Sequence, residues 1–208
     1  MVGWSLLYVA LFMQLAAPLG ELHRQELALM HQVIRRSDLA DLDLWDARAQ
    51  EWRAAKPPEQ VDQLAPVLLL HFFGSWCEPC KAEFPIWRDI APKLEAAHRG
   101  KLRVVYVALT TSRSDMERFT RENRDKLPPL APGSAWYSDA SERLSTGLRQ
   151  ALLLGSGKLP VPLTLWVDDQ RVVRQVLVGS IDRRRMELLE STERLVRLVT
   201  RDRAKPDH

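Results

Sequence analysis

The chain begins with a strongly apolar run over residues 4–17 that only Ser5 and Gln14 interrupt. A run of this length is too short to cross a bilayer, which takes about 20 residues, but it fits the apolar region of a signal peptide. No Lys or Arg precedes the run, and Pro18 disturbs the pattern of small residues at its end. We expect residues 1–20 to be a signal peptide or a membrane anchor, with a buried N-terminal helix as the alternative.

A polar stretch rich in helix-forming residues follows at positions 21–55. Its apolar residues recur at roughly helical spacing, which predicts one or two helices with Trp45 and Trp52 on the buried side. Lys56-Pro57-Pro58 ends the stretch, because proline lacks a backbone donor and disfavours helix in the residue before it. Residues 21–58 are therefore predicted to form a helical extension.

Over residues 59–203 the pattern changes to short apolar runs that alternate with amphipathic segments. Val67–Phe73 has the continuous apolar character of a strand that is covered on both faces. The expected strands are residues 67–73, 102–109, 163–167 and 172–178, with a short segment around 135–137, and the expected helices are residues 79–97, 114–123, 141–154 and 182–200. This order predicts an α/β domain over residues 59–203, with a mixed sheet between helical layers, and a polar tail at 204–208.

Composition and charge narrow the classes of function. Apolar residues make up 46% of the chain and charged residues 27%, which is the balance of a folded protein. The formal net charge is +3, and the basic residues form no stripe interleaved with aromatic residues, so nucleic-acid binding is not expected. The run Arg183-Arg184-Arg185 fits the solvated face of a helix.

The chain has only two cysteines, Cys77 and Cys80. A disulfide-stapled scaffold would need several cysteines spread along the chain, and a structural zinc site would need a second pair or two histidines at ligand spacing. Attachment of c-type haem needs a histidine directly after the second cysteine, where Lys81 stands. The pair is therefore interpreted as redox-active, and neither a metal nor a cofactor is expected.

The position of the pair supports this interpretation, because it follows a predicted buried strand and opens a predicted helix. Cys77 would lie at the helix N-terminus, where unpaired N–H groups and the positive end of the dipole favour a thiolate, the attacking species. Cys80 follows one turn later on the same face, where it could resolve a mixed disulfide within the chain. Pro79 falls in the first turn, where its missing N–H is tolerated.

The stretch Gly74-Ser75-Trp76-Cys77-Glu78-Pro79-Cys80-Lys81-Ala82-Glu83-Phe84-Pro85 resembles the active-site stretch of thioredoxin-like proteins of the TlpA/ResA type. These proteins are extracytoplasmic thiol–disulfide oxidoreductases, and several keep cysteines reduced during cytochrome c maturation. The resemblance covers roughly residues 60–200 and implies a thioredoxin-like fold. It also implies a location outside the cytoplasm, periplasmic or secreted, or with membrane anchoring through residues 4–17.

The same resemblance assigns roles to individual residues. It implies that Cys77 is the nucleophile, that Cys80 is the resolving thiol, and that the two form a redox-active disulfide. Glu83 matches the family's glutamate near the buried cysteine, which takes part in proton chemistry. Trp76, Glu78 and Pro79 would support the active site. The implied partners are protein thiols and disulfides, together with an upstream dithiol donor.

Val161-Pro162, just before the third strand, matches the cis-proline that the family places opposite its cysteines. A cis bond would bring the backbone of Val161 close to Cys77 and offer strand-like hydrogen bonds to a substrate segment. Leu163 departs from the small polar residue usual in the family, and Pro160 adds a second proline. The loop over residues 155–158 is also longer than expected. These departures predict a different choice of partners.

His71 is a further departure, because thioredoxins have an aspartate six residues before the first cysteine and TlpA-like proteins often an asparagine. Its ordinary pKa near neutrality suits a proton relay with Glu83, and the alternative is a hydrogen-bonded core histidine without a redox role. Glu78 and Glu83 place negative charge beside the pair, which disfavours thiolate, and Lys81 opposes this effect in part. The expected potential is nearer to that of thioredoxin, ~−270 mV, than to the ~−120 mV of DsbA.

Three other functions are open at this point. A thioredoxin-fold peroxidase would carry a lone cysteine in a Thr-x-x-Cys setting, which is absent here. A copper or other metal carrier usually spaces its cysteines by three residues and adds a downstream histidine, but only His98 and His208 follow the pair. A non-catalytic binding protein or scaffold would use the pair as a structural disulfide. The segment Gly155-Ser156-Gly157-Lys158 is no phosphate loop, since Leu159 replaces the Ser or Thr that would bind magnesium.

Overall fold

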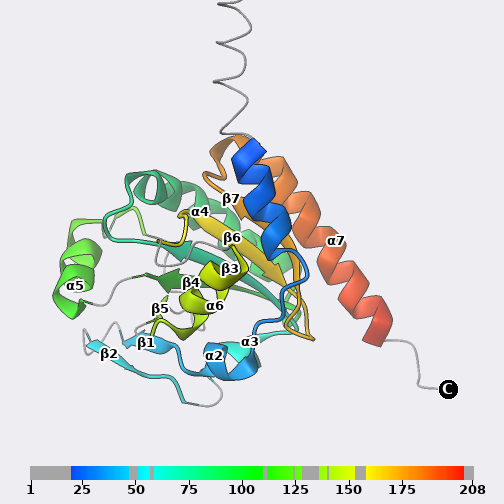
Figure 1. Cartoon of the computed structure of the whole chain (residues 1–208), viewed down its shortest axis with the longest axis horizontal. Coiled ribbons are helices and arrows are strands. Elements are labelled where there is room, and N and C mark those ends of the chain that lie inside the picture. Colours follow the sequence, from blue (N-terminus) through cyan, green and yellow to red (C-terminus); the bar gives the residue numbers. More distant parts are fainter. Residues whose placement is uncertain are drawn as a thin grey trace, which may run out of the picture.

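The computed structural model describes residues 20–46, 51–56, 59–109, 112–123, 125–127, 136–139, 141–152 and 158–203. The strands of these residues form one sheet in the order β2-β1-β5-β4-β3-β6-β7 (Figure 1). They are β1 (Asp43–Asp46), β2 (Glu51–Ala54), β3 (Val67–Phe73), β4 (Leu102–Ala108), β5 (Trp136–Ser138), β6 (Leu163–Val167) and β7 (Val173–Val178). The helices are residues 20–29, α2 (Arg36–Ala40), α3 (Val61–Leu64), α4 (Glu78–Ala97), α5 (Arg113–Glu122), α6 (Arg143–Ala151), the 3₁₀ turn η1 (Asp182–Arg184) and α7 (Arg185–Arg203).

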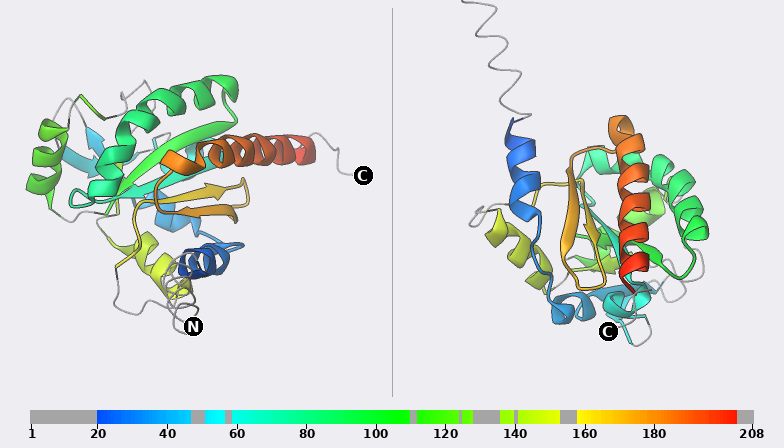
Figure 2. Two further views of the ribbon diagram at one scale, coloured as in Figure 1. Left: turned by 90° about the horizontal axis from the view of Figure 1, so that it is seen from above. Right: turned by 90° about the vertical axis from the view of Figure 1, so that its right-hand side faces the viewer.

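Strand β3 lies in the middle of the sheet and is buried over its whole length. It runs parallel to β4 and antiparallel to β6. Its side chains point alternately to two cores: Leu69 and Phe73 join the core under α4 and α7, whereas Leu68 and Phe72 join the core on the opposite face. Figure 2 shows α4 and α7 on one face of the sheet, with α6 and the 20–29 helix on the other.

The structure confirms the predicted mixed sheet between helical layers. The strands expected at residues 67–73, 102–109 and 163–167 are β3, β4 and β6, and the helix expected at residues 79–97 is α4. Helix α5 begins slightly earlier than predicted, because its N-cap is Ser112 rather than a residue at position 114. The hydroxyl of Ser112 accepts the N–H of Asp115 at 3.3 Å.

The helical prediction is wrong for residues 43–46 and 51–54, which form the antiparallel strands β1 and β2. Trp45 is buried and lies opposite Trp52, and their ring centroids are 5.1 Å apart in an edge-to-face arrangement. Strand β1 also pairs with β5, with Asp43 opposite Ser138. This pairing gives hydrogen-bond partners to the backbone of both strands. Such tertiary contacts override the weak local preference of these residues for a helix. Among the described residues of the stretch predicted as helical, the helices are residues 20–29 and α2.

The segment around residues 20–34 covers the face of the sheet opposite α4 and α7 (Figure 2). Leu29 is fully buried there, and the backbone N–H groups of His31 and Ile34 donate to the carbonyls of Val173 and Arg171 at 2.8 and 2.9 Å. The apolar run expected to be a signal peptide or anchor lies outside the described residues. Among the helices that the structure describes, none is long and apolar enough to cross a membrane.

Candidate active site

Cys77 and Cys80 are joined by a disulfide at the N-terminus of α4. Cys77 is the N-cap residue: its backbone is extended, and its Sγ accepts the N–H of Cys80 at 3.2 Å. Its own N–H donates to the carbonyl of Gly74 at 3.0 Å, which closes the turn between β3 and α4. Because the helix presents free N–H groups and its positive dipole end at Sγ, this position stabilises a Cys77 thiolate once the disulfide is reduced.

The two sulfurs differ in access. Cys77 keeps 4% of its surface exposed, whereas Cys80 is fully buried beneath it. Of the two residues, only Cys77 has any exposed surface. This asymmetry agrees with the order expected from the sequence, in which Cys77 reacts with the partner and Cys80 acts within the chain.

Trp76 forms the exposed apolar surface next to Cys77. Its side chain is 53% exposed, and the Nζ of Lys158 lies 5.3 Å from the centre of its ring. The indole lies directly over Gly74, where an added Cβ would come within 2.6 Å of Trp76 Cε2. Glycine at position 74 is thus required for this placement of the indole.

The peptide bond between Val161 and Pro162 is cis, as the family resemblance implies. The carbonyl of Pro162 accepts the N–H of Gly179 at 2.8 Å, which fixes the loop at the start of β6. Leu163, the first residue of β6, pairs with Phe72 near the end of β3, so the loop lies at the same edge of the sheet as the cysteines. Val161 packs against the core that contains both cysteines.

Glu83 is a buried carboxyl on the same face of α4 as Cys80, one turn further along the helix. Its Oε1 accepts the N–H of Ile181 at 2.5 Å, but its Oε2 has no hydrogen-bond partner. Burial raises the pKa of Glu83 to about 7, because it outweighs the hydrogen bonds of the Ile181 N–H and of the Ser180 and Trp87 side chains, which lower the pKa; the charge of Asp182 makes a smaller contribution in the same direction as burial. Near neutral pH this carboxyl is therefore poised between its protonated and ionised forms.

His71 lies on β3 and is completely buried against the ring of Trp87, with the ring centroids 4.7 Å apart. Its Nδ1 is 3.1 Å from the hydroxyl of Thr164, the residue opposite it on β6. Its Nε2 has no hydrogen-bond partner and faces Oε2 of Glu83 at 3.7 Å. Burial lowers the pKa of His71 to about 3, so the imidazole is neutral at physiological pH.

Glu78 and Lys81 lie on the solvent side of the first turn of α4. They form an ion pair at 2.6 Å, and the Glu78 side chain is largely exposed. Solvent and Lys81 both screen the Glu78 charge, so its influence on the cysteines is weaker than that of a buried carboxylate.

Several contacts of the site were not predicted from the sequence. One of these contacts comes from Thr164 on β6, and a second comes from Ile181 just before η1. The third comes from Lys158 in the loop before Pro162. Thr164 is recognisable only once the register of β3 against β6 is known. The contact of Ile181 with Glu83 depends on how the start of α7 packs on α4. No local pattern signals either contact.

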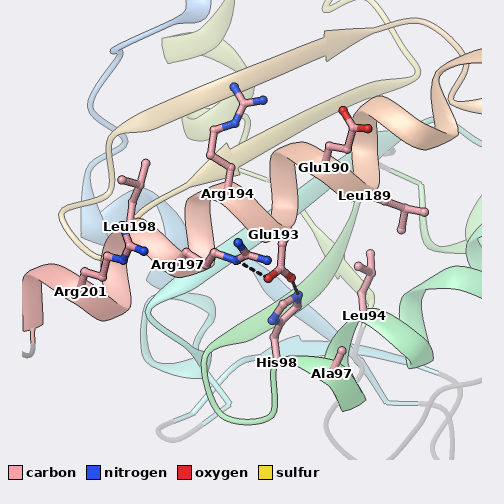
Figure 3. Close-up of a pocket in the computed structure, with 10 residues that line it drawn as sticks. All are labelled: Leu94, Ala97, His98, Leu189, Glu190, Glu193, Arg194, Arg197, Leu198 and Arg201. Carbon is pink, nitrogen blue, oxygen red and sulfur yellow. Dashed lines mark hydrogen bonds and ion pairs between the residues drawn. The ribbon is translucent and has the colours of Figure 1, made fainter.

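A separate groove of about 660 Å³ lies between the end of α4 and α7 (Figure 3). His98 contacts Glu193 in it at 3.1 Å, and Glu193 also binds Arg197 at 2.6 Å. The groove is at the far end of α4, about 30 Å along this helix from Cys77. In the described part of the chain, no three His, Cys, Asp or Glu side chains cluster in a way that could hold a metal ion.

Comparisons with known proteins agree with this geometry. The model of a family described as thioredoxin-like matches residues 66–143. Among solved structures, AhpC of Enterococcus faecalis superposes with a TM-score of 0.56 at 12% identity, over 86% of this chain and 99% of that one. No curated protein matches the sequence.

Two further solved structures are similar at lower TM-scores. A secreted thiol-disulfide isomerase from Corynebacterium glutamicum has 24% identity and a TM-score of 0.45, over 62% of this chain and 70% of that one. StoA from Bacillus subtilis has 19% identity and a TM-score of 0.45, over 62% and 83% of the two chains.

The family match and the sheet topology together define the class: the chain has a thioredoxin-like fold with a cysteine pair at the start of its central helix. These findings agree with the thioredoxin-like fold that the sequence resemblance implies.

Proposed function

We propose that this protein is a thiol–disulfide oxidoreductase that exchanges disulfides with partner proteins through Cys77 and Cys80. The observation that carries the proposal is the disulfide itself, placed at the N-terminus of α4 with the Sγ of Cys77 on the free N–H groups of the first turn. A structural disulfide needs no such placement, whereas a nucleophilic thiolate gains from it.

In the reducing direction the reduced protein starts as a dithiol. The Cys77 thiolate attacks one sulfur of the partner disulfide, forms a mixed disulfide and releases the other partner sulfur as a thiolate. Cys80 then loses its proton and attacks Sγ of Cys77, which releases the second partner thiol and restores the Cys77–Cys80 disulfide. Two electrons pass from the protein to the partner, and an upstream dithiol donor returns them.

Glu83 is proposed to take the proton of Cys80 in the second step. It lies one turn from Cys80 on the buried face of α4, and its pKa of about 7 makes it an effective acceptor near neutral pH. His71 is proposed to assist, because its unpartnered Nε2 faces the unpartnered Oε2 of Glu83. As a neutral imidazole it would accept a hydrogen bond from the protonated carboxyl.

Partner binding is proposed to use Val161, Pro162 and the exposed ring of Trp76. The backbone of Val161 would pair with an extended segment of the partner, and Trp76 would cover its apolar atoms. Glu78 and Pro79 would shape the rim of the site.

The proposed direction in the cell is reduction, outside the cytoplasm, in a role like that of proteins that serve cytochrome c maturation. The acidic groups near the pair support the direction. The apolar run at residues 4–17 and the TlpA/ResA resemblance support the location, either as an exported protein or as one anchored by that run.

The test is a single-turnover reaction of the reduced protein with an excess of bis(2-hydroxyethyl) disulfide, a small neutral probe. We expect the protein to lose two thiols and to release two equivalents of mercaptoethanol per chain, with the Cys77–Cys80 disulfide re-formed. Cys77→Ser serves as the matched control and should react far more slowly. If the wild-type thiols react no faster than those of free dithiothreitol at the same pH, a purely structural disulfide is the better explanation.

A metal carrier is separated from this proposal by analysis of the purified protein. Stoichiometric copper or zinc bound in the reduced state, and lost in Cys77→Ser, would favour the carrier. Full thiol–disulfide exchange with no bound metal favours the oxidoreductase.

A further inference from the structure

A cavity of about 240 Å³ opens beside the active site, between Trp76 and α6. Its lining combines apolar and charged side chains: Trp76, Leu109, Asp139, Glu142, Ser145, Arg149, Lys158 and Leu159. The pocket therefore lies beside the active site, although the exchange reaction itself does not require a pocket.

The two acidic groups of this pocket already have partners. The carboxylate of Asp139 is buried and accepts the backbone N–H groups of Leu144 and Ser145, at 3.3 and 2.6 Å, in the first turn of α6. Glu142 forms an ion pair with Arg149 at 3.3 Å. Glu142 is therefore paired with a cation, and the carboxylate of Asp139 is stabilised by backbone N–H groups of the fold.

The Lys158 ammonium is not compensated in this way. It lies 5.3 Å over the ring of Trp76, and no carboxylate of the described residues is within ion-pair distance of it. Among the described residues, the pocket therefore has a positive charge without a carboxylate partner, held over the ring of Trp76 next to Cys77 in the chain. A cation held against an indole remains available to an anion from outside.

The position of Lys158 along the chain limits its distance from Val161, the residue proposed to pair with the partner. Lys158 precedes Val161 by three residues, a distance of at most about 10 Å in an extended chain. A partner segment that pairs antiparallel with Val161 would bring a residue two or three positions from its cysteine alongside Lys158. That is the range in which a side chain flanking the reacting cysteine would enter the pocket.

The geometry points to a specificity pocket that accepts an acidic side chain of the partner, two or three residues from the cysteine that reacts with Cys77. The apolar walls from Leu109, Leu159 and Trp76 would hold the aliphatic part of a glutamate, and Lys158 would bind its carboxylate. This inference rests on the proposed exchange function, and it names the class of partner that the exchange prefers.

The test compares disulfide-linked dimers of the blocked peptide Gly-Xaa-Gly-Cys-Gly-Xaa-Gly, in which Xaa is Glu, Gln or Lys. The second-order rate constant of the reduced protein is measured for each at low ionic strength. The ratio of the Glu rate to the Lys rate is then compared between the wild type and Lys158→Glu, so that intrinsic differences in peptide reactivity cancel. Lys101→Glu, an exposed site beyond the far end of α4, is the control with the same change of net charge.

We expect the wild type to prefer Glu over Gln over Lys, and Lys158→Glu to lower the Glu/Lys ratio by about four- to thirtyfold. The control should leave the ratio within about twofold, and added salt should reduce the wild-type preference. An unchanged ratio in Lys158→Glu, or an equal change in Lys101→Glu, would overturn the pocket. Because the neutral probe bis(2-hydroxyethyl) disulfide reports exchange alone, failure of the exchange function would be seen separately.

Discussion

Oε2 of Glu83 and Nε2 of His71 face each other at 3.7 Å inside the protein, and neither atom has a hydrogen-bond partner among the described residues. The other oxygen of Glu83 is held by the Ile181 N–H, and the other nitrogen of His71 lies beside the hydroxyl of Thr164. Each side chain is therefore held through its other polar atom, and the side chains of Ser180 and Trp87 also stabilise the ionised form of Glu83. Burial moves the two pKa values in opposite directions, to about 7 for the acid and about 3 for the base. At neutral pH the pair consists of a neutral imidazole and a half-protonated carboxyl.

Replacement of Glu83 by Gln should change how stability depends on pH. The folded-state pKa of about 7 lies above the ordinary value of 4.5, so the folded protein binds an extra proton between these values and loses stability as pH rises through them. Because Gln does not titrate, the variant does not lose stability in this way as pH rises. Between pH 5.5 and 8 we expect its free energy of unfolding to gain about 2 kcal/mol relative to the wild type, in urea titrations of the oxidised proteins. A difference that is constant with pH would contradict a raised pKa of Glu83.

Replacement of His71 by Gln should also change how the free energy of unfolding depends on pH, but in a lower pH range. The folded-state pKa of about 3 lies below the ordinary value of 6.5, so the wild type loses stability as pH falls from 6.5 toward 3. Relative to the wild type, His71→Gln should gain about 2 kcal/mol between pH 7.5 and pH 5. The pH profile of disulfide exchange is the second readout. If this profile is the same in both proteins, His71 is a core histidine and its proposed part in proton transfer is wrong.

The reduction potential of the Cys77–Cys80 pair should be close to that of thioredoxin, ~−270 mV. Glu83 and Glu78 disfavour the thiolate, and Lys81 and the end of α4 only partly offset them. Equilibration with defined ratios of reduced and oxidised dithiothreitol, followed by acid quenching and mass analysis, gives the value. A potential above about −170 mV would mean that the protein oxidises its partners instead of reducing them.

The hairpin β1–β2 should contribute strongly to stability through Trp45. This side chain is buried between the hairpin and the core under α4, so Trp45→Ala should lower the free energy of unfolding by about 3–5 kcal/mol. Trp76→Ala, at an exposed tryptophan, is the matched control and should change it by less than about 0.5 kcal/mol. Equal effects of the two substitutions in urea titrations would place Trp45 outside the core.

Much of the fold could be predicted because its strongest patterns are local. The continuous apolar run of β3 and the amphipathic pattern of α4 each lie within one short stretch of the chain. The cysteine pair was recognisable for the same reason, since strand, cysteines, Pro79 and helix follow directly on one another. The cis bond at Pro162 was expected only from the family resemblance, because no local feature of Val161 requires it.

The features that could not be predicted depend on contacts between distant segments. Residues 43–54 have too few β-branched residues to indicate strands, and their pairing with β5 joins segments about 90 residues apart. The residue types suggest a relay between His71 and Glu83. That Nε2 of His71 faces Oε2 of Glu83 follows from the packing of α4 on β3. In the sequence, Lys158 belongs only to a segment that resembles a phosphate loop. Its position over Trp76 depends on how the loop folds, and no sequence pattern predicts it.

The central claim is that Cys77 attacks the partner and Cys80 resolves the mixed disulfide. Mass spectrometry of reduced Cys80→Ser after reaction with bis(2-hydroxyethyl) disulfide tests it most directly, with Cys77→Ser as the control. We expect a stable adduct of one hydroxyethylthio group on Cys77 in the first variant and little reaction of the buried Cys80 in the second. Rapid modification of Cys80 in Cys77→Ser, with Cys77 left free in Cys80→Ser, would contradict the account.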